Sequence, residues 1–224
     1  MSDIPELQVP TIGIAHSTAR FPVRRIFCVG QNYADHAREM GSDPNRQAPF
    51  FFTKPADSVV ATGMRVPFPS RTADLHHEVE LVIALAEGGV DVKPEDAASM
   101  IFGYAVGIDL TRRDLQAEAK KTGRPWDMSK GFDHSAPIGL LTRGAPPSTG
   151  AITLTIDGHI RQSGDIKHMI WSVPEIIAFL STYVAVAAGD LVFTGTPAGV
   201  GPIRRGERVR GALAGIDPIE ITFD

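Results

Sequence analysis

Two apolar segments that adjoin acidic residues constrain the fold of this chain more than any other feature. One is HHEVELVIAL (His76–Leu85), which alternates and then becomes wholly apolar, and the other is IFGYAVGIDL (Ile101–Leu110). Runs of this kind predict strands that enter a buried core. A carboxylate beside such a run needs a partner, because an uncompensated buried charge is costly. We therefore expect a sheet core with an acidic site at its edge.

The spacing of turn residues predicts the fold class. Glycine and proline account for 22 and 17 of 224 residues, above their usual combined share, so the chain turns often and a helix bundle is disfavoured. Asp157-Gly158 between alternating runs predicts a tight hairpin. The elements lack a regular strand–helix–strand rhythm, so we predict an α+β fold with a mixed β-roll or barrel-like sheet body and flanking helices. We expect an N-terminal arm over residues 1–20, or an irregular first hairpin there, and one domain over 21–224.

Two helices have recognisable ends in the sequence. The segment NYADHAREMG predicts a short helix with Asn32 as its N-cap and Gly41 as its stop. The segment TRRDLQAEAKKTG predicts a longer helix that begins with a near capping box, Thr111 with Asp114, and ends at Gly123.

Composition excludes several classes of protein. The formal charge of −4 disfavours nucleic-acid binding, which needs a basic face. The single cysteine, Cys28, excludes an internal disulfide framework and a multi-cysteine zinc site, and it fits a reducing compartment. Residues 1–10 lack the pattern of a secretory signal, and no apolar run reaches the roughly 18 residues of a membrane helix. We expect a cytoplasmic protein with no membrane or nucleic-acid partner.

Glu78, Glu80 and Asp109 form the most informative cluster. Side chains of residues two apart on a strand point to the same face, and their Cα atoms lie about 7 Å apart. One cation between Glu78 and Glu80 can therefore be coordinated by an oxygen of each. Asp109 ends the next predicted strand, where a third oxygen can join them. Three carboxylates without cysteine predict a site for a hard cation such as Mg²⁺, Mn²⁺ or Ca²⁺. The competing interpretation is the wet face of a half-exposed strand. His76 and His77 are interpreted as structural neighbours rather than ligands.

Two further groups suggest proton chemistry and charge stabilisation. His36 and Glu39 lie three apart on the short predicted helix, as expected for a carboxylate that orients a general base. An inconsequential surface pair explains the same spacing. Lys130 stands between Trp126 and Phe132, so it can be partly desolvated and can hold an anion or enolate. An ordinary lysine with a buried stem explains that position equally well.

Two segments near the acidic cluster suggest anion binding. Arg112, Arg113 and Gln116 open the helix that follows Asp109, where helix amides favour anions. A solvated helix face is the alternative. The turn TGTPAGVG (Thr194–Gly201) offers amides and hydroxyls to a carboxylate, or is simply a sharp turn between strands. It lacks the features of a P-loop or a dinucleotide fingerprint, so nucleotide binding is disfavoured.

Taken in order, these segments resemble the fumarylacetoacetate hydrolase family, in its short acylpyruvase branch. The resemblance covers nearly the whole chain from Phe21, and its motifs are CVGQNYADHAREMG, FFFTKPADSVV, LHHEVELVIAL, the stretch from GYAVGIDL to FDHSAPIG, and GDLVFTGTPAGVGP. It implies a β-roll with flanking helices, a homodimer and one Mg²⁺ or Mn²⁺ per chain. The implied activity is C–C bond hydrolysis of an acylpyruvate (a 2,4-dioxo acid), with fumarylpyruvate of gentisate-type aromatic degradation as the expected substrate.

The resemblance also implies roles for particular residues. It assigns the metal ligands Glu78, Glu80 and Asp109, the catalytic residues His36, Glu39 and Lys130, and the oxo-acid contacts Arg113, Gln116 and Thr196. His36, oriented by Glu39, would take a proton from the attacking water, while Lys130 would stabilise the pyruvate enolate that leaves. Relatives often carry arginine or leucine at the position of Gln31, which bears on substrate choice.

Two alternative functions remain open at this point. Oxaloacetate decarboxylation or tautomerisation also passes through an enolate and needs no water attack. A non-catalytic oxo-acid binding protein is disfavoured, because a binding module has no use for a water-activating pair.

Overall fold

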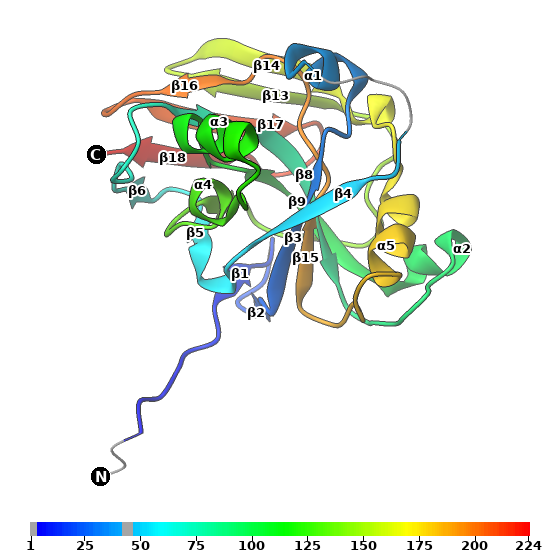
Figure 1. Ribbon diagram of the computed structural model, residues 1–224. Coiled ribbons are helices and arrows are strands. Elements are labelled where there is room, and N and C mark those ends of the chain that lie inside the picture. The colour runs from blue at the N-terminus through cyan, green and yellow to red at the C-terminus, as the bar shows by residue number, and fades with distance from the viewer. Residues whose placement is uncertain (1–3, 42–46) are drawn as a thin grey trace.

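The computed structural model describes residues 4–41 and 47–224. A mixed sheet of eight strands, all within these residues, runs through the middle of the molecule (Figure 1). Its strands, in spatial order, are β4 (Phe50–Lys54), β3 (Arg25–Gly30), β15 (Asp190–Phe193), β8 (Val79–Leu85), β9 (Ile101–Ile108), β11 (Ala136–Ile138) and β5 (Val59–Ala61), with β12 (Thr142–Arg143) paired to β9.

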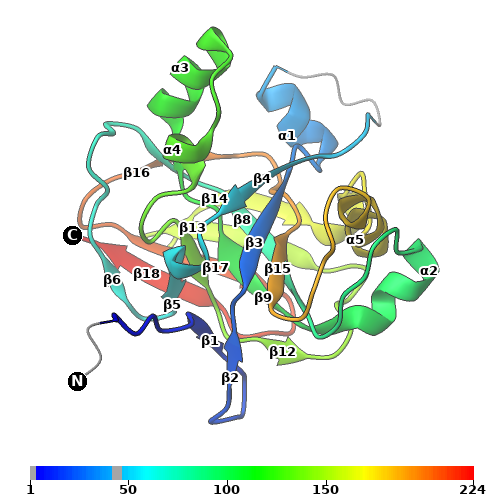
Figure 2. The same cartoon turned by 60° about the horizontal axis from the view of Figure 1, so that its bottom comes forward.

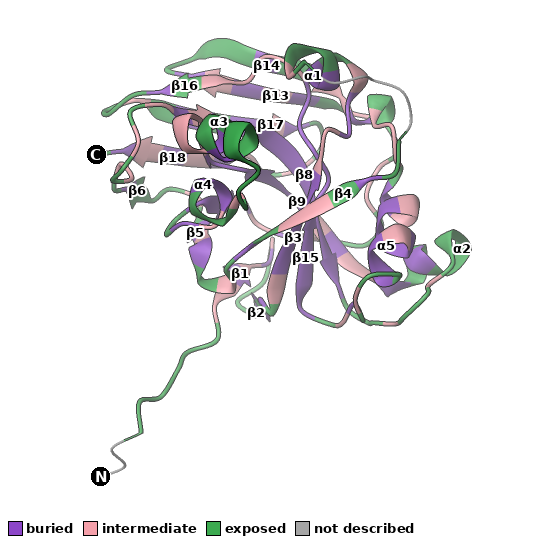
Figure 3. Cartoon of the chain, viewed as in Figure 1, coloured by how far each residue is buried: buried purple, intermediate pink, exposed green. Residues whose placement is uncertain are grey.

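A second sheet covers one face of the first. Its order is β14 (His159–Asp165), β13 (Ala151–Ile156), β17 (Arg208–Leu213), β18 (Ile219–Phe223) and β6 (Arg65–Val66). Alternate residues of β13, such as Ile152 and Leu154, pack with Leu81 and Ile83 of β8 in the main core. The buried strands at this junction are evident in Figure 3. Burial explains both sequence patterns. Strand β13 is buried on one face and therefore alternates, whereas β8 is buried on both faces and is therefore continuously apolar.

Two smaller sheets complete the body. A three-stranded sheet pairs β10 (Thr111–Arg112), β7 (Leu75–His77) and β16 (Gly201–Ile203), and a hairpin pairs β1 (Thr11–Gly13) with β2 (Arg20–Pro22). The hairpin packs on the other face of the large sheet, where Ile12 and Ile14 are buried. The N-terminal segment, expected to be an arm or an irregular hairpin, therefore contains a packed hairpin over residues 11–22. The exposed chain that leaves the body in Figure 1 covers residues 4–9.

The helices lie at the edges of the sheets, as Figure 2 shows. They are α1 (Ala34–Glu39), α2 (Pro94–Ala97), α3 (Arg113–Thr122), α4 (Asp127–Lys130) and α5 (Val173–Ser181), with 3₁₀ turns at Ala56–Ser58, Ala98–Met100 and Ile166–His168. The predicted α+β class, a mixed β-roll with flanking helices, is confirmed. No helix of the described ranges is long and apolar enough to cross a membrane.

Three local predictions are wrong, and each fails because of a tertiary contact. The strand expected over His76–Leu85 is broken at Glu78, because β7 pairs with β10 and β16 while β8 pairs with β9 and β15. Asn32 does not cap α1: its buried amide donates to the carbonyl oxygens of Trp171 and Thr194, and the N-cap is Tyr33.

The start of α3 is the third difference. Thr111 belongs to β10 and its hydroxyl donates to Glu78, so the N-cap is Arg112. Asp114 accepts from the amide of Ala73 and the hydroxyl of Thr72 instead of closing a capping box. The stop at Gly123, with φ of 66°, is confirmed.

Candidate active site

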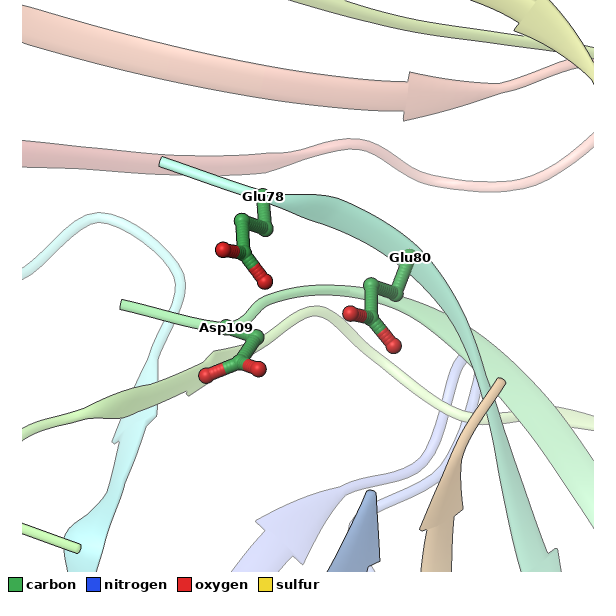
Figure 4. A group of neighbouring side chains, drawn as sticks. All are labelled: Glu78, Glu80 and Asp109. Atoms are coloured by element: carbon green, nitrogen blue, oxygen red, sulfur yellow. The ribbon is translucent and has the colours of Figure 1, made fainter. Parts of the chain in front are cut away.

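Three carboxylates from neighbouring elements converge at one end of the large sheet (Figure 4). Glu78 lies in the link between β7 and β8, Glu80 lies on β8, and Asp109 directly follows β9. One oxygen of each lies within 4.8 Å of the others, and the residues are 5%, 2% and 0% exposed. The amide of Asp109 donates to the Glu78 carbonyl at 2.8 Å, which fixes the two segments together. Sheet pairing thus brings together carboxylates from distant parts of the chain.

Three cations balance these carboxylates inside the protein. The Nζ atom of Lys130 lies 2.9 Å from Glu78 Oε2 and 2.6 Å from Asp109 Oδ2. Arg113 forms an ion pair with Glu78 Oε1. Lys54 Nζ lies 2.8 Å from Asp109 Oδ1. Burying this many charges is possible only because they are paired.

Glu80 is the least compensated of the three carboxylates. Burial and the neighbouring charges of Asp109 and Glu78 raise the pKa of Glu80 well above its usual value. Burial alone would also raise the pKa of Glu78, but Lys130 and Arg113 outweigh it and hold that pKa well below its usual value. Additional positive charge beside Glu80 would therefore be favourable.

The donor set fits a hard divalent cation. Asp109 Oδ1 is buried and makes no aligned hydrogen bond despite its ion pair with Lys54. Glu80 Oε2 accepts from the Gly195 amide at 2.7 Å, and within the described chain no hydrogen bond reaches its Oε1. Carboxylate oxygens that keep free lone pairs are the ligands that Mg²⁺ and Mn²⁺ prefer. The three carboxylates can therefore hold such an ion.

His36 and Glu39 lie together, as their spacing predicts. His36 Nδ1 is 3.2 Å from Glu39 Oε2. His36 is 5% exposed and lines the pocket that also contains Glu78 and Glu80. The Glu39 carboxylate accepts from the amide of Gly199 at 3.1 Å. Because the Gly199 amide fixes the Glu39 carboxylate, that carboxylate can hold the His36 imidazole in one orientation, as a general base requires.

The glycine-rich turn between β15 and β16 binds carboxylates, but they are the protein's own. Its amides at Gly195 and Gly199 donate to Glu80 and Glu39. Both glycines have φ of 95°, a conformation that side chains disfavour. The Thr196 hydroxyl donates to the Val79 carbonyl at 2.8 Å, so its only proton is already used. The turn therefore positions the acidic side chains of the site.

Arg113 and Gln116 share one face of α3 and line the same pocket. Arg113 Nη1 donates to Gln116 Oε1 at 2.5 Å, and its Nε lies 3.3 Å from His76 Nδ1. The opposite nitrogen of His76 is held by Asp74 at 2.9 Å. His76 thus orients Arg113. Of the predicted site residues, all line the pocket except Glu39, which supports His36, and Asp109, which lies beneath the other carboxylates.

Two buried polar residues of the site were not singled out from the sequence. Gln162 on β14 is 1% exposed: its Oε1 accepts from His77 and the Val79 amide, and its Nε2 donates to Thr196 Oγ1. Lys54 ends β4 and donates to the carbonyl oxygens of Leu110 and Lys130. For Lys54 the sequence signal was a charged side chain at the end of the apolar run FFFTK. Gln162 lies in the polar strand HIRQSGD, where nothing in the sequence distinguishes it.

A family comparison agrees with this geometry. The family model described as "Fumarylacetoacetate (FAA) hydrolase C-terminal" matches residues 25–223. That range includes every carboxylate, cation and turn of the pocket. The resemblance to this family in the sequence motifs is confirmed.

Individual relatives and solved structures extend the comparison. The chain is 41% identical to a fumarylpyruvate hydrolase of Ralstonia sp over 80% of this chain and 95% of the relative. It is 38% identical to a mitochondrial oxaloacetate decarboxylase of Dictyostelium discoideum, over 90% and 93% of the two chains. The crystal structure of a Pseudomonas aeruginosa fumarylpyruvate hydrolase in complex with Mn²⁺ and pyruvate superposes with a TM-score of 0.96, at 47% identity, and covers 100% of this chain and 99% of that one.

Proposed function

The chain belongs to the fumarylacetoacetate hydrolase family, and from that premise we propose that it hydrolyses the C–C bond of an acylpyruvate. The proposed substrate is fumarylpyruvate and the products are fumarate and pyruvate, as in gentisate-type aromatic degradation. The proposal includes one Mg²⁺ or Mn²⁺ per chain, a homodimer and a cytoplasmic location. The similarity to fumarylpyruvate hydrolases of Ralstonia and Pseudomonas supports this choice of substrate.

One observation carries the proposal: His36, backed by Glu39, lines the same pocket as Glu78 and Glu80. A general base beside a cation site can activate a water molecule for attack on a carbonyl compound that is bound there. An oxo-acid binding protein has no need of this pair.

Each residue has a definite task in the proposed reaction. The cation, when bound, supplies Lewis-acid stabilisation of the negative charge that develops on the oxo-acid. His36 removes a proton from water, and the resulting hydroxide adds to the acyl carbonyl. The C–C bond between that carbon and the methylene of the pyruvate part then breaks, and the proton held by His36 passes to the enolate carbon. Arg113 and Gln116 hold the carboxylate end of the substrate. Lys130 has three N–H donors, and its two carboxylate contacts leave one to stabilise the enolate that departs as pyruvate.

Oxaloacetate decarboxylation or tautomerisation is the second candidate. It is supported by the 38% identity to the Dictyostelium oxaloacetate decarboxylase. In either reaction Lys130, and the cation that the three carboxylates would hold, would stabilise an enolate. In this case His36 would transfer a proton to or from carbon rather than activate water.

Pyruvate release from fumarylpyruvate, acetylpyruvate and oxaloacetate tests hydrolysis against decarboxylation, and the ultraviolet absorbance of the oxaloacetate enol tests tautomerisation, which releases no pyruvate. The protein is treated with EDTA, assayed, and assayed again after Mg²⁺ or Mn²⁺ is added. We expect no activity after chelation, recovery with either ion, and the highest kcat/KM with fumarylpyruvate. A higher kcat/KM with oxaloacetate would favour the second candidate, and full activity after thorough chelation would contradict the metal site.

A further inference from the structure

The pocket has a second end that the proposed chemistry does not use. The buried carboxylates Glu78 and Glu80 mark its inner end. Its outer end consists of lining residues that are half-buried or exposed: Gln31, Phe50, Lys120 and Trp126. An adjoining hollow shares Phe50, Phe52 and Trp126. A substrate whose oxo-acid part lies among the inner residues must direct its acyl arm toward this outer end.

Helix α3 links the two ends. Arg113, Gln116 and Lys120 follow one another at intervals of three and four residues, so they share one helix face. The helix rises 1.5 Å per residue, which separates Arg113 and Lys120 by about 10 Å along the axis. Arg113 lies at the carboxylates, and Lys120 lies about two turns away. This face therefore presents a cation at each end of the pocket.

Lys120 differs from the other cations of the pocket. Arg113 and Lys130 are each paired with a buried carboxylate. Among the described residues no acidic side chain forms an ion pair with Lys120. Its Nζ instead lies 5.4 Å from the ring centroid of Trp126. Burial and the charge of Arg113 lower the pKa of Lys120, and the opposing charge of Glu78 does not offset them.

The walls around Lys120 are aromatic. The Trp126 ring packs against Phe50 and Phe52, at centroid distances of 5.7 and 6.0 Å. Flat rings suit a planar unsaturated chain, and a lysine at the far side of such walls suits an anion at the end of that chain.

We propose that Lys120 selects substrates whose acyl arm ends in a carboxylate, and that Trp126 holds the Lys120 ammonium in the position to bind it. This inference rests on the proposed acylpyruvate hydrolysis. The preferred substrate class is therefore a dicarboxylic acylpyruvate, such as one with a fumaryl arm. Acylpyruvates with a methyl-terminated arm gain nothing from Lys120.

Paired substrates and paired variants test the proposal. Lys120→Met removes the charge and keeps much of the stem. Lys121→Met is the control, because both lysines are exposed on the same helix but Lys121 does not line the pocket. We expect Lys120→Met to lower kcat/KM for fumarylpyruvate by about 10- to 100-fold, mainly through KM, as for loss of one charged hydrogen bond. Activity with acetylpyruvate should change less than about twofold, Lys120→Arg should retain most activity, and Lys121→Met should match the wild type.

Two results would overturn the proposal: an equal loss on both substrates, which indicates a structural role for Lys120, or no loss on fumarylpyruvate. Calorimetric titration with fumarate and with crotonate, in Mg²⁺, separates this proposal from the proposed function. The two acids differ only in carboxylate against methyl. If the wild type hydrolysed neither 2,4-dioxo acid, the hydrolase proposal would fail, and tighter binding of fumarate that is lost in Lys120→Met would still support the role of Lys120. Equal binding of both acids would contradict it.

Discussion

Lys54 Nζ lies 2.8 Å from Asp109 Oδ1, and the same ammonium group donates to the carbonyl oxygens of Leu110 and Lys130. One buried cation from β4 thereby joins the end of β9 to the end of α4. This contact supports the direct pairing of Lys130 with Asp109 in fixing the relative position of the two site residues.

Replacement of Lys54 by methionine should destabilise the protein strongly. The change leaves the buried Asp109 with less compensation and leaves two carbonyl oxygens without a donor, which costs about 3–5 kcal/mol. Urea unfolding monitored by tryptophan fluorescence measures this free energy. Lys121→Met, an exposed change, should stay within about 0.5 kcal/mol of the wild type. A loss below 1 kcal/mol in Lys54→Met would show that the ion pair contributes little.

Glu80→Gln should separate metal affinity from stability. The amide keeps the size of the side chain and an oxygen for the Gly195 amide, but it removes one of three crowded negative charges. We expect Mn²⁺ affinity to fall by more than about 100-fold, since loss of an outer partner alone typically costs 10- to 100-fold. The metal-free protein should melt at a higher temperature, by about 2–4 °C per kcal/mol recovered. Calorimetric titration and thermal melts give the two values, and unchanged Mn²⁺ affinity would remove Glu80 from the ligand set.

His36→Ala should abolish hydrolysis while Mn²⁺ still binds. Loss of a general base lowers kcat by about 10²–10⁴-fold, and the three carboxylates are untouched. Glu39→Gln should lower kcat less, because the imidazole remains but loses its orienting charge. Steady-state assays and Mn²⁺ titration of the same preparations check both effects. Retained hydrolysis in His36→Ala would exclude the pair from the mechanism.

The stability of the protein should fall in mild acid because of His77. Burial lowers the pKa of His77 from 6.5 to about 4, so the folded state keeps this ring neutral while the unfolded chain takes up a proton. The contribution of neutral His77 to the free energy of unfolding is complete above pH 6.5. It declines as the pH falls toward 4 and is lost below that pH, a total decrease of up to about 3 kcal/mol. Urea unfolding at pH 7 and pH 4.5 measures the difference. The variant His77→Asn should show a flatter dependence, and an identical slope would contradict this assignment.

Gly195→Ala should be more harmful than a glycine substitution without close neighbours. A Cβ at Gly195 would lie 2.7 Å from the Cβ of Asn32, in a backbone with φ of 95°. Gly206 has φ of 84°, and a Cβ placed there would have no atom within 4 Å. Gly206→Ala therefore measures the cost of the backbone conformation alone. We expect a loss of about 1 kcal/mol for Gly206→Ala and about 2–4 kcal/mol for Gly195→Ala. Equal losses in thermal melts would show that Asn32 yields to the added methyl group.

Local sequence patterns predicted the parts of the site that lie close together in the chain. The two-residue spacing of Glu78 and Glu80 and the three-residue spacing of His36 and Glu39 both correspond to neighbours in the structure. The helix period explains the pair on α1. Glu78 lies in the link just before β8, so its position beside Glu80 depends also on the hydrogen bond from the Asp109 amide to its carbonyl.

Only the tertiary structure decided which groups complete the site. Asn32 reaches Thr194 across 162 residues, Gln162 reaches His77 across 85, and Lys54 meets the carbonyl of Leu110 across 56. Lys120 likewise reads as one more surface lysine until Trp126 and the pocket lie beside it. No period along the chain encodes such contacts, because they arise where sheets pack and loops meet. A single sequence therefore shows the polar residues, but it does not show which partners they find once they are buried, and a buried polar group needs such a partner.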